Sequence, residues 1–362
     1  MAAAEADTET RDLLEALVDI PSPTGEERAA AERLVAFFEE HGREAWLDEV
    51  GNVRAPADDR VLLTSHVDTV PGDIPVRVEH EPRSGSDEGG TAAETDETYE
   101  PPVLWGRGSV DATGPLAAMA VAAVRTGVSF AGVVGEEVDS RGARHLVEDR
   151  EPPDAVVNGE PSGWDGVTLG YRGILSGTYV AASESGHTSR PEPNAIQDAL
   201  GWWGRVEERF EHDPYEPTFE QVTAKPVRVE GGTSEDGLSV EATLDVQLRV
   251  PPSLTVETVR ERADGELRDG HVNWHDEVPP VMVSPRSEVA RRFRVAIRNA
   301  GGEPRLLRKT GTSDMNVFTA WDVPMATYGP GDSDLDHAPD ERLSLPELDR
   351  ATAVLTEVAT EL

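Results

Sequence analysis

The sequence contains no cysteine among its 362 residues. This absence excludes disulfide bonds, a catalytic thiolate and metal sites built from thiolate ligands. Any metal centre would therefore have to use histidine, aspartate and glutamate. Long apolar runs are also missing. The longest, residues 115–124, ends at Arg125, well short of the roughly 20 residues that a membrane-spanning helix needs. The sequence predicts no membrane association.

Lysine is nearly absent, with only Lys225 and Lys309, whereas 70 acidic residues face 33 basic ones and give a net charge of −37. The acidic residues are spread along the chain, which argues against a single acidic interaction tail. Such a charge repels itself unless salt screens it, so we predict a protein of a salt-in halophile. The N-terminus lacks the features of a secretion signal, which favours the cytoplasm. We predict no nucleic-acid partner, because binding the phosphates of a duplex needs a basic face.

The order of predicted elements indicates two domains, as expected for this length. Apolar strand patterns alternate with helical ones before residue 169 and after residue 282, which is typical of an α/β fold. The intervening segment has the order βαββαβ of a ferredoxin-like domain. We predict a mixed, largely parallel sheet sandwiched by helices in residues 1–168 and 283–362, with an inserted α+β domain in residues 169–282. The acidic stretch 79–102 is predicted to be a surface loop.

The stretch LWGRGSVDATGPLAAM, residues 104–119, places one carboxylate, Asp111, between a glycine-rich turn and an apolar run. Glycine permits turns that a Cβ would block, and Pro115 is favourable in the first turn of a helix. The pattern predicts a tight turn before a buried helix. Asp111 could then bind a cation or simply cap that helix, and this stretch alone does not decide between the two.

Other acidic residues and histidines favour the metal interpretation. Most of them directly follow a predicted strand, where open α/β sheets place their sites. His66 and Asp68 are two residues apart, so on an extended backbone they point to one face. This spacing predicts that the Asp68 carboxylate accepts a hydrogen bond from the ring nitrogen of His66 that does not face a metal. The complete set of candidates is His66, Asp68, Asp111, Glu136, Glu137, Glu160 and His337.

These motifs resemble the dinuclear zinc aminoacylase/carboxypeptidase family, which includes acetylornithine deacetylase and succinyl-diaminopimelate desuccinylase. The similarity covers nearly the whole chain in the family's order, and its segments are SHVDTVP, WGRGSVDATGPLAAM, GEEVDSRGA, NGEPS, SGHTSRP, GTSDMN and LDHAPDE. Within the family, VTLGYRG, KTGTSDMNVF and YGPGDSDLDH are most similar to the LysW-amino-acid hydrolases. Those enzymes release lysine or ornithine from a small acidic carrier protein.

The resemblance implies two Zn²⁺ or Co²⁺ ions bridged by Asp111 and a water or hydroxide. His66 and Glu160 would complete one site, and Glu137 and His337 the other. It also implies that Glu136 is the general base and that the peptide bond after Asp111 is cis. Zinc and cobalt cannot be separated from the sequence, because oxygen donors with imidazole suit both ions.

The resemblance further implies a homodimer paired through the inserted domain, in which His187 reaches the neighbouring subunit's site to stabilise the oxyanion. A surface histidine is the alternative for His187. Candidates for binding the amino acid are Arg249, Thr312, Ser313 and Asp314.

The predicted function is a metal-dependent amidohydrolase that releases ornithine or lysine from the C-terminal glutamate of the carrier LysW, in arginine and lysine biosynthesis. One alternative is a deacetylase or desuccinylase acting on free acyl amino acids, such as N-acetylornithine or N-succinyl-diaminopimelate. Another is a metal-binding scaffold that has lost catalysis, which the presence of Glu136 argues against.

Overall fold

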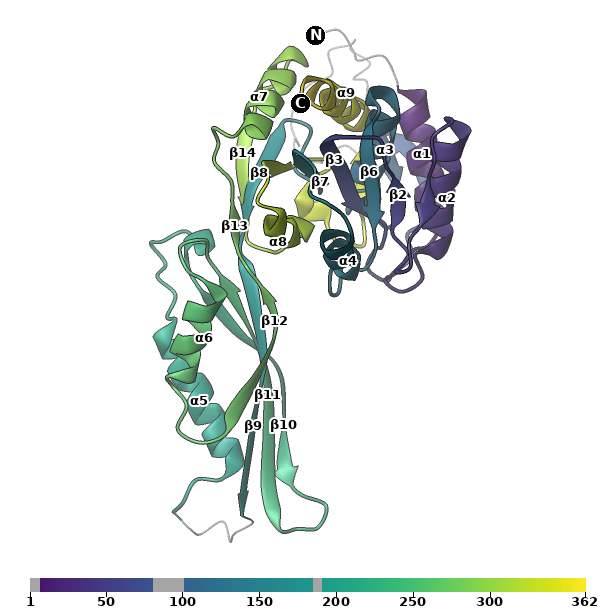
Figure 1. Cartoon of the computed structure of the whole chain (residues 1–362). Helices are drawn as coiled ribbons and strands as arrows, with labels where there is room; N and C mark the ends of the chain where they lie inside the picture. The colour runs from purple at the N-terminus through teal and green to yellow at the C-terminus, as the bar shows by residue number, and fades with distance from the viewer. Residues whose placement is uncertain (1–6, 81–100, 185–190) are drawn as a thin grey trace, which may run out of the picture. The chain divides into compact units, whose positions relative to one another are not determined.

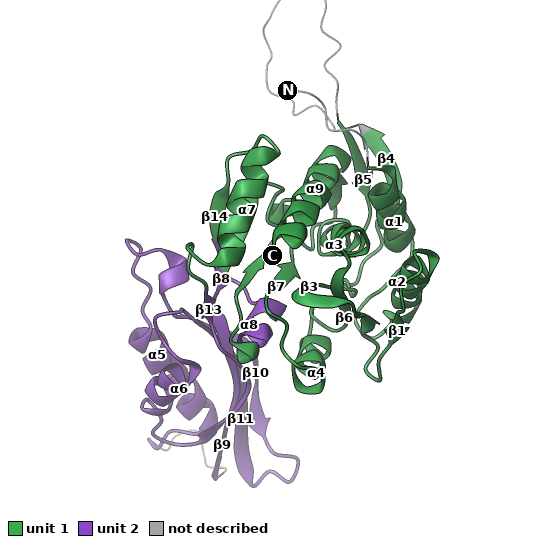
Figure 2. Cartoon of the chain, turned by 45° about the horizontal axis from the view of Figure 1, so that its top comes forward, with its two compact units in different colours: residues 1–169, 283–307, 320–362 green, residues 170–282, 308–319 purple. Residues whose placement is uncertain are grey.

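The computed structural model describes residues 7–80, 101–184 and 191–362, and its chain divides into two compact units (Figures 1 and 2). Unit 1 comprises residues 1–169, 283–307 and 320–362, and unit 2 comprises residues 170–282 and 308–319. The sequence placed residues 308–319 with the first domain. They group with unit 2 because the Asn316 side chain donates to the carbonyl oxygens of Arg172 and Pro279, at 3.2 and 2.8 Å.

Unit 1 is an α/β sandwich around a mixed sheet, as the sequence predicts. The sheet has the order β1-β2-β6-β3-β7-β15-β8, with β13 and β14 also paired to β8. Strand β13, the last two residues of β8 and the last two residues of β14 are grouped with unit 2. The pairs β3–β6, β3–β7 and β7–β15 are parallel. The strands are β1 (Trp46–Leu47), β2 (Val53–Ala55), β3 (Asp58–His66), β6 (Val128–Val133), β7 (Val156–Gly159), β8 (Gly166–Tyr171), β13 (Val281–Met282), β14 (Arg305–Lys309) and β15 (Met325–Thr327).

Helices cover this sheet and form one hydrophobic core with it. The most apolar helix is the one predicted after Asp111, and Pro115 lies in its first turn. At the N-terminus of the chain, the Asp7 carboxylate caps the first helix by accepting a hydrogen bond from the Thr10 amide. The helices of unit 1 are α1 (Thr8–Val18), α2 (Arg28–Glu40), α3 (Thr113–Thr126), α4 (Arg141–Asp149), α7 (Glu288–Asn299) and α9 (Leu345–Glu361), with a short 3₁₀ helix, η3 (Ser333–Leu335).

A second, three-stranded sheet in unit 1 has the order β16-β5-β4 and is antiparallel throughout. It consists of β4 (Arg77–His80), β5 (Pro102–Trp105) and β16 (Arg342–Ser344). Its first two strands include both ends of the segment predicted to be a loop, because Glu79 pairs with Val103 and His80 pairs with Pro102. The loop prediction is therefore wrong at its ends, and its interior, residues 81–100, lies outside the described residues.

Unit 2 has the predicted ferredoxin-like order, with a four-stranded antiparallel sheet arranged β10-β11-β9-β12. Helices α5 and α6 lie on the same face of this sheet (Figure 1) and share a core with it. A capping box between Asn194 and Gln197 fixes the start of α5. The elements are β9 (Gly173–Glu184), α5 (Ala195–Arg209), η1 (Thr218–Glu220), β10 (Thr223–Thr233), β11 (Ser239–Val250), α6 (Val256–Asp264), β12 (His271–Val278), α8 (Asp314–Phe318) and η2 (Thr319–Trp321), the last of which straddles the boundary with unit 1.

Candidate metal centre

Three neighbouring parallel strands of unit 1 end at candidate ligands. His66 is the last residue of β3, Glu160 directly follows β7, and Glu136 and Glu137 follow β6 closely. Because β6, β3 and β7 are adjacent and parallel, their carboxyl ends meet at one edge of the sheet. The final six residues of β3 are all buried, which anchors His66 in the core.

The His66 ring is oriented by Asp68, but not by its carboxylate as predicted. Nδ1 of His66 lies 2.8 Å from the main-chain oxygen of Asp68, whereas the nearer carboxylate oxygen is 3.7 Å away. The carboxylate instead accepts hydrogen bonds from the Glu136 and Glu137 amides, at 3.1 and 3.2 Å, and from the Thr24 hydroxyl at 2.8 Å. A fully buried carboxylate needs such donors. Asp68 therefore fixes the turn that carries both glutamates.

Asp111 is not a helix cap. Helix α3 begins at Thr113 with Ala112 at its N-cap and no capping side chain. The Asp111–Ala112 peptide bond is cis, which confirms the prediction. One carboxylate oxygen of Asp111, Oδ1, lies 3.3 Å from Nε2 of His66, and the other, Oδ2, lies 3.1 Å from Nε2 of His337. The carboxylate therefore lies between two imidazoles.

The remaining candidates lie beside these groups. Nε2 of His337 is 3.1 Å from a carboxylate oxygen of Glu137. Ligand atoms of His66, Asp111 and Glu137 lie within 4.8 Å of one another, as do those of His66, Glu136 and Glu160. The structure thus brings together all seven residues singled out from the sequence.

Charge coupling in the cluster shifts its pKa values strongly. The hydrogen bond to Asp111 raises the pKa of His337 to about 9. Burial alone would lower the pKa of His66, but the hydrogen bond to Asp111 and the charges of Glu136 and Glu160 raise it well above its usual value. Burial opposes ionisation of Asp111, yet hydrogen bonds from both histidines hold its pKa below the usual range. Two imidazoles among four carboxylates form a donor set that suits divalent transition metals.

The predicted amino-acid-binding residues belong to unit 2. Nη1 of Arg249 donates to the Thr312 hydroxyl at 3.2 Å. Ser313 caps α8, with its hydroxyl accepting from the Met315 amide at 3.2 Å. Asp314 is buried at the first position of α8. His187 lies outside the described residues.

Sequence reasoning missed Glu341, although it lies inside the quoted motif LDHAPDE. Its carboxylate is 1% exposed and accepts hydrogen bonds from the amides of Gly108, Val110 and Asp111. The only feature of the sequence that could have drawn attention to Glu341 was its place in this motif, four residues after His337.

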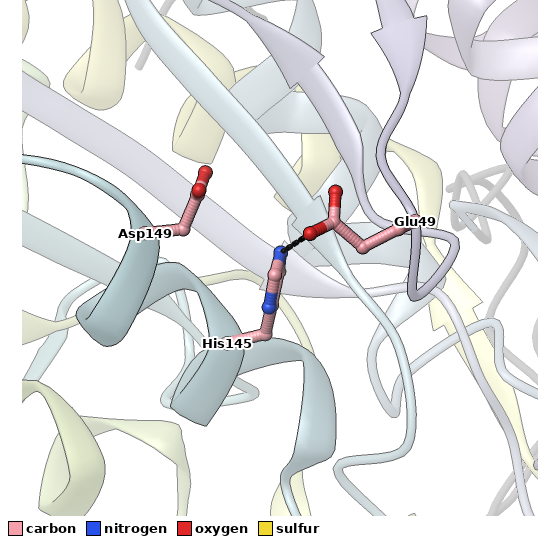
Figure 3. Close-up of side chains that lie close together, drawn as sticks. All are labelled: Glu49, His145 and Asp149. Atoms are coloured by element: carbon pink, nitrogen blue, oxygen red, sulfur yellow. Dashed lines mark ion pairs between the residues drawn. The ribbon is translucent and has the colours of Figure 1, made fainter.

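A separate histidine–carboxylate group lies in unit 1 and contains Glu49, His145 and Asp149 (Figure 3). Nε2 of His145 is 3.5 Å from Glu49 Oε1, a pairing that the sequence did not predict. Asp149 already pairs with the Arg54 guanidinium at 2.7 Å. Arg54 already supplies a positive charge to this group of side chains. We therefore interpret Glu49, His145 and Asp149 as part of an ion-pair network and not as a metal site.

The fold and the cluster define the class of protein. The family model for peptidase family M20/M25/M40 matches residues 62–361, and the chain belongs to this family. It is 39% identical over 379 residues to the LysW-lysine hydrolase of Deinococcus radiodurans, covering 97% of this chain and 96% of that protein. It is 29% identical over 361 residues to the LysW-lysine/LysW-ornithine hydrolase of Sulfurisphaera tokodaii, covering 97% and 95%.

The fold is also that of solved M20 structures. The M20 metallo-carboxypeptidase Sso-CP2 of Sulfolobus solfataricus superposes with a TM-score of 0.74 at 19% identity, covering 97% of this chain and 98% of that one. No helix among the described residues has the length and apolar character required to span a membrane.

Proposed function

We propose that the cluster in unit 1 is a dinuclear metal centre in which Asp111 is the shared ligand. His66 and Glu160 complete one site, and Glu137 and His337 complete the other. The observation that carries this proposal is the Asp111 carboxylate, whose two oxygens face two different imidazoles at 3.3 and 3.1 Å. Zinc and cobalt both suit these donors.

In this proposal Glu136 is the general base. Two divalent cations, when bound, polarise an amide carbonyl and lower the pKa of water. Glu136 takes the proton from the attacking water and returns it to the departing amine. Its amide is held by Asp68 at 3.1 Å, and its carboxylate lies within 4.8 Å of ligand atoms of His66 and Glu160. This placement gives the base a fixed position beside one metal site.

The proposed reaction is hydrolysis of the amide that joins ornithine or lysine to the C-terminal glutamate of the carrier protein LysW. The names of the relatives from Deinococcus radiodurans and Sulfurisphaera tokodaii support it, because the chain matches both over nearly its whole length. The reaction would release the free amino acid in arginine or lysine biosynthesis, in the cytoplasm.

A side-by-side turnover assay tests the proposal that the substrate is a carrier-linked amino acid. LysW-linked ornithine and lysine are compared with N-acetylornithine and N-succinyl-diaminopimelate at molar potassium chloride. We expect kcat/KM to be far higher for the carrier-linked amino acids. Comparable efficiency on a free acyl amino acid would contradict the proposal.

The variant Glu136→Gln tests the base. It should retain both metals and lose turnover by about 10²–10⁴-fold, the usual contribution of general acid–base catalysis. Glu137→Gln is the matched control, because this neighbouring change should remove a metal ligand and lower the bound metal. Undiminished turnover in Glu136→Gln would refute the assignment.

We also propose a homodimer formed through unit 2. Strand β10 is at an edge of its sheet and is 11 residues long, and Val227 and Val229 on it are 56% and 62% exposed. A long edge strand with exposed apolar residues is prone to pair with another chain.

Light scattering tests the proposed dimer. It should give the mass of a dimer for the native protein, and Val227→Lys should shift this mass toward that of a monomer. A monomeric native protein would refute the proposal.

A further inference from the structure

The turn that carries Asp111 is held by one buried carboxylate. Oε1 of Glu341 accepts hydrogen bonds from the amides of Val110 and Asp111 at 2.8 and 3.1 Å, and Oε2 accepts from the Gly108 amide at 3.0 Å. Backbone amides of one turn that converge in this way form an anion-binding concavity. Here the anion is a side chain of the protein itself.

Arg107 balances the charge of this carboxylate. Its Nη1 donates to Oε2 of Glu341 at 2.8 Å, and the two side chains are 14% and 1% exposed. A carboxylate so deeply buried is tolerated only when it is paired and hydrogen-bonded. Three amides and one guanidinium together satisfy both oxygens of Glu341.

The backbone of the turn is built for this contact. Gly108 has a φ of +80°, and a Cβ at this position would lie 2.5 Å from Cγ2 of Thr69. Only glycine fits here without strain or displacement of a neighbour. The turn therefore presents its amides to Glu341 in a conformation that a larger residue would not allow.

Strand pairing sets the register between Glu341 and the turn. Glu341 directly precedes β16, which pairs with β5 so that Arg342 faces Trp105. The main-chain oxygen of Glu341 also accepts from the Gly106 amide at 3.4 Å. His337 lies four residues before Glu341 on the same segment. The β5–β16 pair thus aligns the segment of one proposed ligand, His337, with the turn of another, Asp111.

We propose that Glu341 is a positioning residue that fixes Asp111 between the two metal sites and couples its position to that of His337. This inference rests on the proposed dinuclear centre. Glu341 acts through the backbone of residues 108–111.

Metal binding tests the inference without the use of any substrate. Glu341→Gln keeps the shape of the side chain but replaces one accepting oxygen with a donor that opposes the facing N–H groups. We expect Co²⁺ or Zn²⁺, titrated with a competing chelator, to bind about 10–100-fold more weakly, the usual cost of losing a group that orients a metal ligand. The visible absorption of the cobalt-loaded protein should also change, because the geometry at Asp111 changes.

Asp349→Asn is the matched control. The Asp349 carboxylate has a side chain that is 2% exposed, pairs with Arg11 and accepts from the Asp7 amide at 3.2 Å, but it lies on α9 and touches none of the seven cluster residues. This variant should lose stability while keeping native metal affinity and a native cobalt spectrum. An equal loss of metal affinity in both variants would reduce the role of Glu341 to general stability and overturn the inference.

Arg107→Gln provides a second route if Glu341→Gln does not fold. It leaves the Glu341 carboxylate in place without its counter-charge, and we expect a smaller loss of metal affinity in the same direction. Native affinity and a native cobalt spectrum in the folded variants would overturn the inference. A native protein that binds two metals but does not cleave LysW-linked substrates would instead refute the proposed substrate and leave the role of Glu341 standing.

Discussion

At the scale of single residues, Asp111 differs from every other ligand of the proposed centre because it would serve both sites. Asp111→Asn should therefore remove both metals, whereas His337→Ala should remove only one. The reason is that His337 faces one oxygen of Asp111 and His66 faces the other. Elemental analysis of the purified variants measures the number of metal ions bound per protein. A single metal retained in Asp111→Asn would contradict the shared-ligand assignment.

The raised pKa values of the histidines predict how metal binding responds to pH. In the metal-free protein the pKa of His337 is about 9, so its imidazole is protonated at neutral pH. A metal ligand must be deprotonated, so binding releases this proton, and His66 contributes in the same direction. Metal affinity should therefore rise with pH as His337 loses its proton near pH 9.

Calorimetry in two buffers with different ionisation heats measures this release. We expect about one proton per protein from His337 near neutral pH, and a further contribution in the same direction from His66. A binding enthalpy that does not depend on the buffer would contradict the prediction. The variant His337→Ala is the control, and it should release fewer protons.

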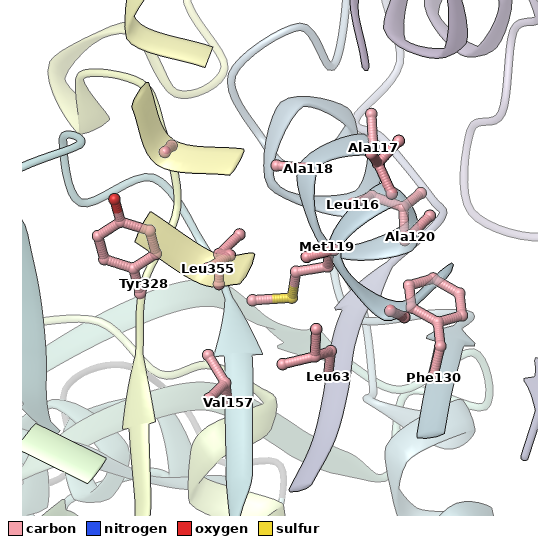
Figure 4. Packing of buried hydrophobic residues seen from close by; sticks show 14 of the residues in the cluster. Leu63, Leu116, Ala117, Ala118, Met119, Ala120, Phe130, Val157, Tyr328 and Leu355 are labelled. Atoms are coloured by element: carbon pink, nitrogen blue, oxygen red, sulfur yellow. The ribbon is translucent and has the colours of Figure 1, made fainter. Parts of the chain in front are cut away.

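At the scale of elements, α3 links the proposed metal centre to the core. Met119 on α3 is fully buried and lies close to Leu63 of β3, Val157 of β7 and Leu355 of α9 (Figure 4). Met119→Ala should lower the free energy of unfolding by about 2–5 kcal/mol, because it removes buried methylene groups and leaves a cavity. Urea unfolding at fixed salt measures the loss.

The control for this change is Val295→Ala on α7. Val295 is 51% exposed, so its truncation should alter the free energy of unfolding by no more than about 0.5 kcal/mol. Similar effects in the two variants would show that α3 does not carry the packing that its burial indicates.

The sequence predicted the longer elements because their patterns are local. The apolar run after Asp111 became α3, and the segments ending near His66 and Asn158 became β3 and β7. Short elements such as β16, with three residues, have too few positions to show a period. The role of Glu341 was missed for a related reason, since its contact with Gly108 joins residues 233 positions apart.

At the scale of the whole molecule, the net charge of −37 should make the stability of the fold depend on salt. Self-repulsion should weaken as salt rises, because the Debye length falls from about 10 Å at 0.1 M to about 3 Å at 1 M. We therefore predict that the unfolding temperature rises over this range, with each kcal/mol gained worth about 2–4 °C for domains of this size.

Thermal unfolding across a potassium chloride series checks this prediction. A variant with several exposed glutamates replaced by glutamine, Glu49 and Glu257 among them, should depend less on salt. These two side chains are 74% and 72% exposed, so the change should leave the packing intact. An unfolding temperature that is constant or falls with added salt would contradict the halophilic interpretation.

The sequence by itself determined the chemistry and the class of fold. Without cysteine, only imidazole and carboxylate ligands were possible, and the alternation of strand and helix patterns placed these residues at strand ends. The tertiary structure alone decided which atoms meet. It assigned the carboxylate of Asp68 to the Glu136 and Glu137 amides rather than to His66, and it turned the two oxygens of Asp111 toward different histidines. Such choices depend on contacts between distant segments, whose geometry is set by packing and backbone register, and local periodicity carries no information about them.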